Sequence, residues 1–286
     1  MYSTLFLYFG NETISLKRTR LYFRGAQLML EQKLTGSCGA IILDVDLAHL
    51  SNADFDFVQS KLEENGVLYF PDQDLDIDSF RTLGHRFGEL EKHKIVDGIE
   101  DYPEVIKVHK PSGESASFGV GWHSDNSFQA EPSIASMLYA KIVPPFGGDT
   151  VFANQVLAYE GLSDKMKELV NGLNAVHSAS IAYQTESAKK KFTKETAITY
   201  SWDDSILNEV IHPVVRVHQP SGKKALFVNE MFTLRFEGMS PSDSRPILDY
   251  LTRHASRPEF CCRLKWQADG LAIWDNSLVQ HYAVDD

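Results

Sequence analysis

The feature that most constrains the fold of this chain is a pair of short segments, far apart in the sequence, that carry side chains able to bind a metal. The first is Trp122-His123-Ser124-Asp125, and the second runs from Trp274-Asp275-Asn276 to His281. His-X-Asp followed far downstream by a second His is the spacing of a two-histidine, one-carboxylate facial triad. Such a triad suits Fe(II), because it leaves the other half of the coordination sphere open. A fold that uses the pattern must bring His281 beside His123 and Asp125.

The spacing of the first two candidate ligands is compatible with a single ion. His123 and Asp125 lie two residues apart, and on an extended segment residues i and i+2 point to the same side. His-X-Asp also occurs often by chance with a purely structural role, so the prediction depends on its surroundings. These are Trp122, the run Gly147-Gly148-Asp149-Thr150 and the tryptophan-containing run before His281.

Length and composition indicate a globular protein and argue against two classes of partner. The chain has 286 residues, of which 43% are hydrophobic and 23% charged, as in an ordinary folded domain with a substantial core. The net charge of -11 argues against nucleic acid, which requires a clustered basic face. No apolar run approaches the ~20 residues that cross a bilayer, so we expect no membrane association.

The cysteines favour a reducing compartment. Cys38, Cys261 and Cys262 are an odd set with two adjacent members, which does not form a disulfide framework. We therefore expect a cytoplasmic location. A mitochondrial presequence stays open as an alternative, because residues 17–24 carry basic side chains and no acidic one.

Apolar periodicity and turn residues predict many short strands and a few helices. Helices are expected over residues 52–65, 77–87, 163–173 and 240–255. Strands are expected over residues 67–70, 133–143, 212–218, 225–229, 260–266 and 271–275. This pattern is mainly β with some α, and it indicates a double-sheet sandwich or jelly roll with helices packed outside. Residues 185–204 fit neither class and are either a solvated polar face or an active-site lid.

Further matches to a known family extend over most of the chain. Beyond the two metal-binding segments they are Asn65-Gly66-Val67-Leu68-Tyr69-Phe70, Arg86-Phe87-Gly88-Glu89-Leu90, residues 144–150, His212-Pro213-Val214-Val215-Arg216 and Phe227-Val228-Asn229-Glu230. With these stretches, which cover roughly residues 36–286, the chain resembles the taurine/alpha-ketoglutarate dioxygenase family. Members of this family depend on Fe(II) and 2-oxoglutarate.

The resemblance implies a fold and a set of residue roles. The implied fold is a double-stranded β-helix, or jelly roll, with flanking helices. His123, Asp125 and His281 match the iron ligands of the family. Thr150 matches the threonine whose hydroxyl contacts the distal carboxylate of 2-oxoglutarate, and His93 falls where the taurine enzyme keeps a substrate-contacting histidine.

Each of these roles has a structural alternative, such as a satisfied core histidine or an ordinary strand threonine. Asn229 is a further candidate for the substrate pocket. His212 and His218 are expected to be structural, and Trp122 and Trp274 to pack as walls beside the metal.

The family pattern also sets the expected domain organisation. Residues 1–35 are expected to be an N-terminal extension, with disorder the preferred interpretation, and residues 36–286 one dioxygenase domain. The family keeps an arginine for the distal carboxylate shortly after the second histidine ligand, whereas this sequence ends at Asp286. We therefore expect a truncated domain that lacks its last strand. Leaving a buried carboxylate unpaired costs roughly 3–5 kcal/mol, and Arg216 and Lys141 are the substitute cations to consider.

These features predict an Fe(II)- and 2-oxoglutarate-dependent dioxygenase. It would use O2 to hydroxylate a small organic substrate, such as a sulfonate, ether or amine, and release succinate and CO2. Taurine itself is not expected, because Val96 and Gly119 stand where taurine-cleaving members carry polar contacts. Two alternatives stay open, an impaired or inactive jelly-roll relative that acts as a binding protein and a zinc hydrolase built on the same three ligands. A homo-oligomer is compatible with the sequence.

Overall fold

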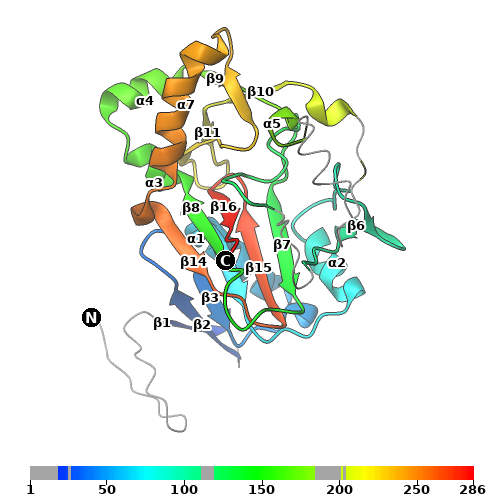
Figure 1. Cartoon of the computed structure of the whole chain (residues 1–286). Helices are drawn as coiled ribbons and strands as arrows, with labels where there is room; N and C mark the ends of the chain where they lie inside the picture. The colour runs from blue at the N-terminus through cyan, green and yellow to red at the C-terminus, as the bar shows by residue number, and fades with distance from the viewer. Residues whose placement is uncertain (1–18, 25–26, 111–118, 184–200, 202–203) are drawn as a thin grey trace, which may run out of the picture.

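The fold is a mixture of helices and β-sheets in which two sheets face each other (Figure 1). The computed structural model describes residues 19–24, 27–110, 119–183, 201 and 204–286. The larger sheet has the strand order β1-β2-β3-β4-β15-β7, in which β3 and β4 are parallel and the other neighbours antiparallel. Its strands are β1 (Thr19–Arg24), β2 (Gln27–Lys33), β3 (Ala40–Leu43), β4 (Val67–Phe70), β7 (Ala135–Ala140) and β15 (Gly270–Asp275).

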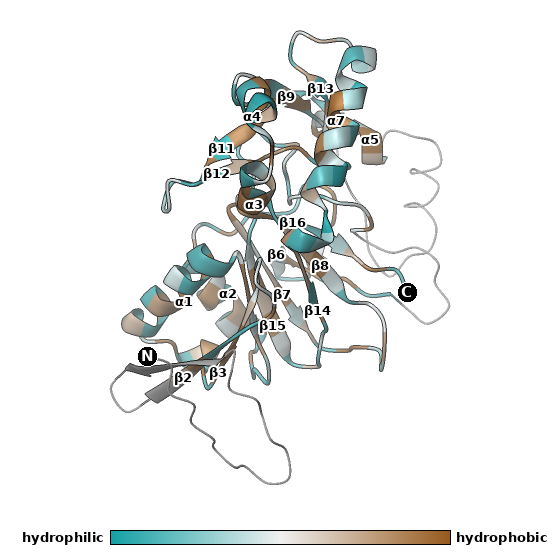
Figure 2. Cartoon of the chain, turned by 90° about the vertical axis from the view of Figure 1, so that its left-hand side faces the viewer, coloured by the Kyte–Doolittle hydropathy of each residue, from teal (hydrophilic) through white to brown (hydrophobic). Residues whose placement is uncertain are grey.

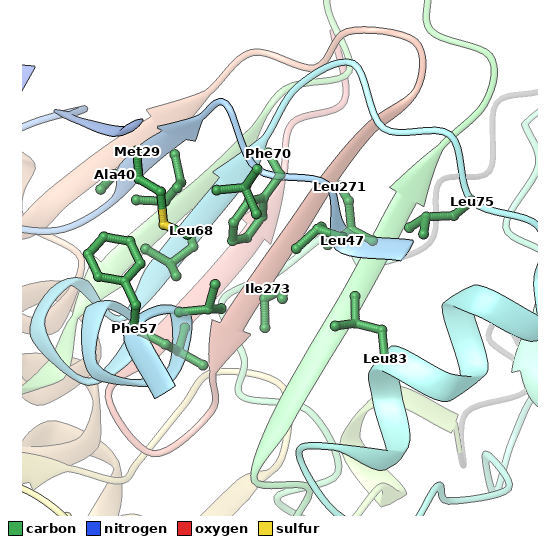
Figure 3. Packing of buried hydrophobic residues seen from close by; sticks show 14 residues of the cluster. Met29, Ala40, Leu47, Phe57, Leu68, Phe70, Leu75, Leu83, Leu271 and Ile273 are labelled. Atoms are coloured by element: carbon green, nitrogen blue, oxygen red, sulfur yellow. The ribbon is translucent and has the colours of Figure 1, made fainter. Parts of the chain in front are cut away.

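Two helices, α1 (Asn52–Asn65) and α2 (Ile77–His85), cover one face of this sheet (Figure 2). Phe57 of α1 and Leu83 of α2 point toward the buried side chains of β4 and β15 (Figure 3). The cluster consists of Met29, Ala40, Ile42, Val45, Leu47, Phe57, Val58, Leu62, Leu68, Phe70, Leu75, Leu83, Leu271 and Ile273. Burial of these side chains fixes the sheet against the helices.

The opposite face of the large sheet packs on a smaller sheet with the order β14-β8-β16. The strands of this sheet are β8 (Thr150–Asn154), β14 (Cys261–Leu264) and β16 (Val279–Ala283). β4 is therefore buried on both sides, which explains its uninterrupted apolar sequence. Leu68 and Phe70 face the helices, whereas Val67 and Tyr69 face the smaller sheet together with Trp274 of β15.

A third cluster of apolar side chains lies at the end of the molecule that carries α4 and α7, away from the β1–β2 hairpin (Figure 1). Here the strands are β9 (Asn174–His177), β10 (Val210–Pro213), β11 (Val215–Val217), β12 (Lys224–Leu226) and β13 (Thr233–Phe236). The helices are α3 (Gln155–Glu160), α4 (Asp164–Asn171) and α7 (Pro241–Ala255). Helix α5 (Ser180–Tyr183) packs in a separate cluster with Phe128 and Phe232. A separate short pair joins β5 (Gly98–Ile99) and β6 (Tyr102–Ile106).

Most of the expected helices and strands are confirmed within a few residues. Helix α1 begins as expected, because the Oγ of Ser51 accepts the N–H of Asp54 at 3.2 Å. It ends at Gly66, whose φ of 71° is left-handed and whose N–H donates to the carbonyl of Leu62. The expected strand over residues 133–143 is shorter in the structure, where β7 spans Ala135–Ala140.

The prediction of one strand over residues 212–218 is wrong. Residues 212–218 form two separate strands, β10 and β11, because the chain leaves the first ladder at Pro213. Proline has no N–H to donate to a ladder. The N–H of Val214 donates to the carbonyl of Leu173 at 3.0 Å instead. β8 and β16, which the sequence pattern did not reveal, are the strands that carry Thr150 and His281.

Two strands lie within residues 1–35, for which disorder was the preferred interpretation. β1 pairs with β2, and β2 pairs with β3 from Leu30 opposite Leu43 to Lys33 opposite Ala40. Residues 1–18 and most of 185–204 lie outside the described residues. Within the described parts of the chain, no helix has the length and apolar character needed to cross a bilayer.

Candidate metal centre

His123 and His281 lie side by side because their backbones pair. The N–H of His123 donates to the carbonyl of His281 at 3.1 Å, and the N–H of His281 donates to the carbonyl of His123 at 2.8 Å. Residues directly opposite in an antiparallel pair project to the same face, and the two ring centroids are 4.1 Å apart. His281 belongs to β16, whereas His123 forms an isolated bridge rather than the expected extended segment.

Asp125 completes a group of three potential ligands. Its Oδ1 lies 3.6 Å from Nε2 of His123 and 3.7 Å from Nε2 of His281. One potential ligand atom from each of the three residues lies within 4.8 Å of the others. Two donors that bind the same ion at about 2.1 Å can be at most ~4.2 Å apart, so both separations from Oδ1 fit a common ion.

The protonation of His123 is fixed by its backbone neighbour. Nδ1 of His123 lies 2.8 Å from the carbonyl oxygen of Gly121, which only accepts, so Nδ1 carries the proton. In the neutral ring Nε2 therefore presents its lone pair toward Asp125, as a metal ligand requires. Gly121 has a φ of 124°, and a Cβ at this position would lie 2.9 Å from Cγ of Met231. The backbone conformation that directs the Gly121 carbonyl to His123 therefore requires glycine at this position.

The pKa values of His281 and Asp125 are shifted toward the forms that bind a metal. Burial, and next the charge of His123, lowers the pKa of His281 to about 3, although Asp125 opposes the shift. The pKa of Asp125 lies below its usual value. Burial alone would raise it, but the charges of His281 and His123 and the hydrogen bond from Ser136 outweigh burial. A neutral imidazole and an ionised carboxylate are the forms that bind a divalent cation.

The donor set fits Fe(II). The separations of 3.6 and 3.7 Å between Oδ1 of Asp125 and the two Nε2 atoms are too long for hydrogen bonds. The three donors therefore face one another without bonding to one another, as expected of ligands that share an ion. Two imidazole nitrogens and one carboxylate oxygen on one side of an ion leave the other side open, whereas structural zinc sites are closed by four ligands.

Thr150 lies near this group with a defined hydrogen-bond direction. It begins β8 and is paired with Ala283, two residues beyond His281. Its Oγ1 accepts the indole N–H of Trp266 at 3.0 Å. Because an indole N–H only donates, the Thr150 hydroxyl accepts here and keeps its own proton for another acceptor. A carboxylate oxygen is such an acceptor, so the arrangement is compatible with the role expected from the sequence.

His93 is half-buried, and its ring orientation is also fixed by the backbone. Its Nδ1 accepts the N–H groups of Ile95 at 3.2 Å and Val96 at 3.0 Å. The proton of the neutral ring therefore sits on Nε2. Burial is the main cause that lowers the pKa of His93, and the charges of Asp125 and then Glu91 oppose it. The contact of His93 with substrate stays a prediction.

Asn229 makes internal hydrogen bonds. Its Nδ2 donates to Oγ of Ser127 at 2.9 Å, and its Oδ1 accepts the N–H of Phe232 at 2.8 Å. It thereby links the segment that follows Asp125 to the loop of Phe232, whose ring centroid is 6.1 Å from that of His123. These bonds hold the site together, and the expected contact of Asn229 with substrate stays a prediction.

Aromatic rings pack against His281, and one of them is Trp274, which was expected to lie beside the metal, whereas a contact of Trp122 with the ligands stays a prediction. The ring of Trp274 lies 5.0 Å from that of His281, and Phe152 lies 5.9 Å from the same ring. Trp122 packs on Tyr282 at 5.7 Å. His281 is therefore packed between Phe152 of the smaller sheet and Trp274 of the larger sheet.

The two substitute cations considered from the sequence have different surroundings. Lys141 pairs with Asp269 at a well-exposed position and also bonds to Tyr139. Arg216 is half-buried, with its guanidinium 4.4 Å from the ring centroid of Phe227. Burial lowers the pKa of Arg216, and the charge of Asp275 opposes this shift. Arg216 is thus the better shielded of the two cations.

The family described as "Taurine catabolism dioxygenase TauD, TfdA family" matches residues 31–286. The chain belongs to this family. The matched range contains His123, Asp125 and His281 together with Thr150, and the resemblance found in the sequence is confirmed.

Individual relatives of the family are similar over most of this chain. The alpha-ketoglutarate-dependent sulfate ester dioxygenase of Pseudomonas putida is 34% identical over 265 residues, which are 88% of this chain and 83% of that protein. A relative from Schizosaccharomyces pombe is 31% identical over 89% of this chain, but the chain spans 65% of its length. The crystal structure of a taurine dioxygenase from Burkholderia xenovorans superposes with a TM-score of 0.73 at 29% identity, covering 90% of this chain and 82% of that one.

Two side chains at the site were not found from the sequence. Ser136 donates to Oδ2 of Asp125, and Trp266 donates to Thr150. Ser136 is a serine in a strand of apolar and aromatic residues, and Trp266 ends an expected strand, so neither position carries a signal of its own. Asn276 stood in a conspicuous run beside Trp274, but its partners could not be assigned without the structure.

Proposed function

We propose that this chain is an Fe(II)- and 2-oxoglutarate-dependent dioxygenase that hydroxylates a small organic anion of the sulfonate or sulfate ester class. The convergence of His123, Asp125 and His281 in a chain of this family carries the proposal. The sulfate ester dioxygenase of Pseudomonas putida and the taurine dioxygenase of Burkholderia xenovorans support the class of substrate, because both names denote sulfur oxyanion compounds.

The proposal includes the fold of the core. The two facing sheets, with β8 and β16 on one side and β4 and β15 on the other, would form a double-stranded β-helix, or jelly roll. The likeness to the taurine dioxygenase structure supports this assignment. In such a core the ligands lie between the sheets, and the packing on both sides holds them in place.

His123, Asp125 and His281 would hold the iron. Bound iron supplies the redox chemistry that activates oxygen. The chain contributes two neutral nitrogen donors and one negative charge, which partly neutralise a divalent cation. The carbonyl of Gly121 orients His123, and the backbone pairing with β16 orients both histidines.

Thr150 and His93 would bind the two organic reactants. The proton that Thr150 keeps is directed to an acceptor, and we assign that acceptor as the distal carboxylate of 2-oxoglutarate. The Nε2–H of His93 would donate to the anionic group of the substrate. Because Nδ1 of His93 already accepts two backbone N–H groups, this donor stays in the neutral ring and does not require acidic pH.

The aromatic walls would limit water at the site. Trp274 and Phe152 pack against His281, which is buried. A site with little water favours transfer of oxygen to the bound substrate over side reactions.

The decisive test is binding of the cosubstrate followed by oxygen uptake. Anaerobic calorimetry should show 2-oxoglutarate binding that depends on Mn(II), and Fe(II) with an alkyl sulfate ester should then give oxygen uptake with release of succinate. Asp125→Ala should abolish both. Glu259→Gln removes a surface carboxylate that pairs with Arg257 and should change neither.

The alternatives give different results in the same experiments. A zinc hydrolase would cleave a substrate without oxygen uptake, and a binding protein without catalysis would show neither metal-dependent 2-oxoglutarate binding nor succinate. Either result would overturn the proposal. The cytoplasmic location and the homo-oligomer stay predictions.

A further inference from the structure

Asp125, Ser136 and Asn276 form a closed ring of hydrogen bonds beside the candidate ligands. The N–H of Asp125 donates to Oδ1 of Asn276 at 3.1 Å. Nδ2 of Asn276 donates to Oγ of Ser136 at 2.9 Å. Oγ of Ser136 donates to Oδ2 of Asp125 at 2.6 Å, which closes the ring.

The direction of every bond in this ring is determined. Oδ1 of Asn276 also receives the indole N–H of Trp274 at 3.2 Å, and both of its partners can only donate. The oxygen of the amide must therefore lie on this side, and the NH2 group must face Ser136. The Ser136 oxygen accepts from that group, so its own proton is left for Asp125.

Two of the three residues in this hydrogen-bonded ring are held by paired strands. Ser136 lies on β7 opposite Trp274 of β15, and Asn276 follows the end of β15 directly. The N–H of Asn276 donates to the carbonyl of Ile134 at 2.9 Å, and the Asn276 side chain is buried. The two partners of Asp125 thus have fixed positions that do not depend on a bound metal.

The ring of hydrogen bonds gives the two carboxylate oxygens of Asp125 different partners. Oδ2 is engaged by Ser136, whereas Oδ1 is the oxygen that faces the Nε2 atoms of His123 and His281. A carboxylate that binds through one oxygen leaves three positions of an octahedral ion open. A carboxylate that binds through both oxygens takes one of these positions, and a chelating cosubstrate and O2 together require all three.

We propose that Ser136 and Asn276 are positioning residues that hold Asp125 to one-oxygen coordination and thereby reserve the open side of the metal for 2-oxoglutarate and O2. This inference rests on the proposed function. It also explains the run Trp274-Asp275-Asn276. The indole of Trp274 orients the side-chain amide of Asn276, and this amide directs the Ser136 proton to Asp125.

Removing the Ser136 hydroxyl should separate metal binding from cosubstrate binding. In Ser136→Ala, Oδ2 of Asp125 loses its donor and becomes free to bind the ion. Mn(II) affinity without cosubstrate should then be kept or increase, whereas the affinity of the Mn(II)-loaded protein for 2-oxoglutarate should fall at least about tenfold. A side chain that merely supported the fold would weaken both affinities together.

Anaerobic calorimetry with Mn(II), and then with 2-oxoglutarate on the Mn(II)-loaded protein, measures both affinities without turnover. Ser136→Thr keeps a hydroxyl and should restore 2-oxoglutarate binding. Ser133→Ala is a matched control, because the Ser133 hydroxyl bonds to Glu91 and Asn126 and not to Asp125. Thermal melting of the metal-free variants shows that each is folded.

Three results would overturn the inference while leaving the proposed function intact. They are unchanged 2-oxoglutarate affinity in Ser136→Ala, parallel loss of Mn(II) and 2-oxoglutarate affinity in that variant, and an equal effect of Ser133→Ala. Failure of the unaltered protein to bind 2-oxoglutarate with Mn(II) is a separate result. It would overturn the proposed function itself, and this inference with it.

Discussion

The imidazole rings of His123 and His281 lie 4.1 Å apart, and their backbones exchange two hydrogen bonds. Main-chain pairing with β16 therefore brings the two candidate ligands together, although they stand far apart in the sequence. This pairing does not involve the imidazoles. The backbone at positions 123 and 281 is therefore expected to keep its conformation when either side chain is replaced.

Replacing His281 by glutamine should abolish metal binding and leave the metal-free fold intact. Nδ1 of His281 is buried without a hydrogen-bond partner among the described residues, so removing the ring breaks no hydrogen bond at that atom. We expect Mn(II) affinity to fall about a hundredfold or more, because loss of a ligand should cost at least as much as the most damaging changes behind a ligand. Calorimetry measures this loss, and the melting temperature in EDTA should change by only a few degrees. Retained Mn(II) affinity would show that His281 is no ligand.

Trp266→Phe should weaken binding of 2-oxoglutarate without affecting the metal. The variant keeps an aromatic ring against Tyr69, where the centroids are 5.8 Å apart, but it loses the N–H that directs the Thr150 hydroxyl. Loss of one such neutral hydrogen bond corresponds to about 0.5–1.5 kcal/mol, or roughly a two- to tenfold increase in Kd. In a Thr150→Val background the Trp266→Phe change should have no further effect. Additive effects in the double variant would show that Trp266 does not act through the Thr150 hydroxyl.

Much of the fold could be predicted from local patterns. Helix α1 shows both of its ends in the sequence, through Ser51 and Gly66, and β4 shows its burial through four successive apolar residues. The split between β10 and β11 could not be predicted in the same way. It depends on the N–H of Val214 bonding to Leu173, a contact between segments that are distant in the sequence.

Some residues of the candidate site could also be predicted from the sequence, and others could not. His123, Asp125 and His281 were predicted together because their spacing, the runs of residues around them and the resemblance to the family all point to one metal site. Ser136 and Trp266 were not, because a hydroxyl in a strand and a buried tryptophan have no distinctive pattern. Their roles follow from which atoms can donate and which accept, and this requires coordinates.

His177 should make the stability of the metal-free protein depend on pH below neutrality. Burial, followed by the charges of His212 and Arg216, lowers the pKa of His177 to about 3 in the folded state, whereas its ordinary value is 6.5. Between these values the unfolded chain binds the proton and the folded chain does not. The free energy of unfolding therefore rises with pH in this window, and the stability contributed by neutral His177 is present above pH 6.5 and lost as pH falls toward 3.

The variant His177→Gln tests this dependence. It lacks the titrating group, so the slope of unfolding free energy against pH should be smaller by up to about 1.4 kcal/mol per pH unit. Urea unfolding in EDTA at several pH values between 4 and 7 measures the slope. An unchanged slope would mean that His177 is protonated in the folded protein or titrates as it does in the unfolded chain.

Leu271→Ala should destabilise the protein strongly, because Leu271 is fully buried between β15 and the helices that cover the large sheet (Figure 3). Truncation of a buried leucine leaves a cavity and costs about 2–5 kcal/mol. Leu169→Ala is the matched control, since Leu169 lies on α4 with 40% of its surface exposed, and its truncation should cost about 0.5 kcal/mol or less. Midpoints of urea unfolding for the two metal-free variants provide the comparison. Equal midpoints would mean that the packing of α1 and α2 against β15 contributes little to stability, and that the ligands of β16 are held by the smaller sheet alone.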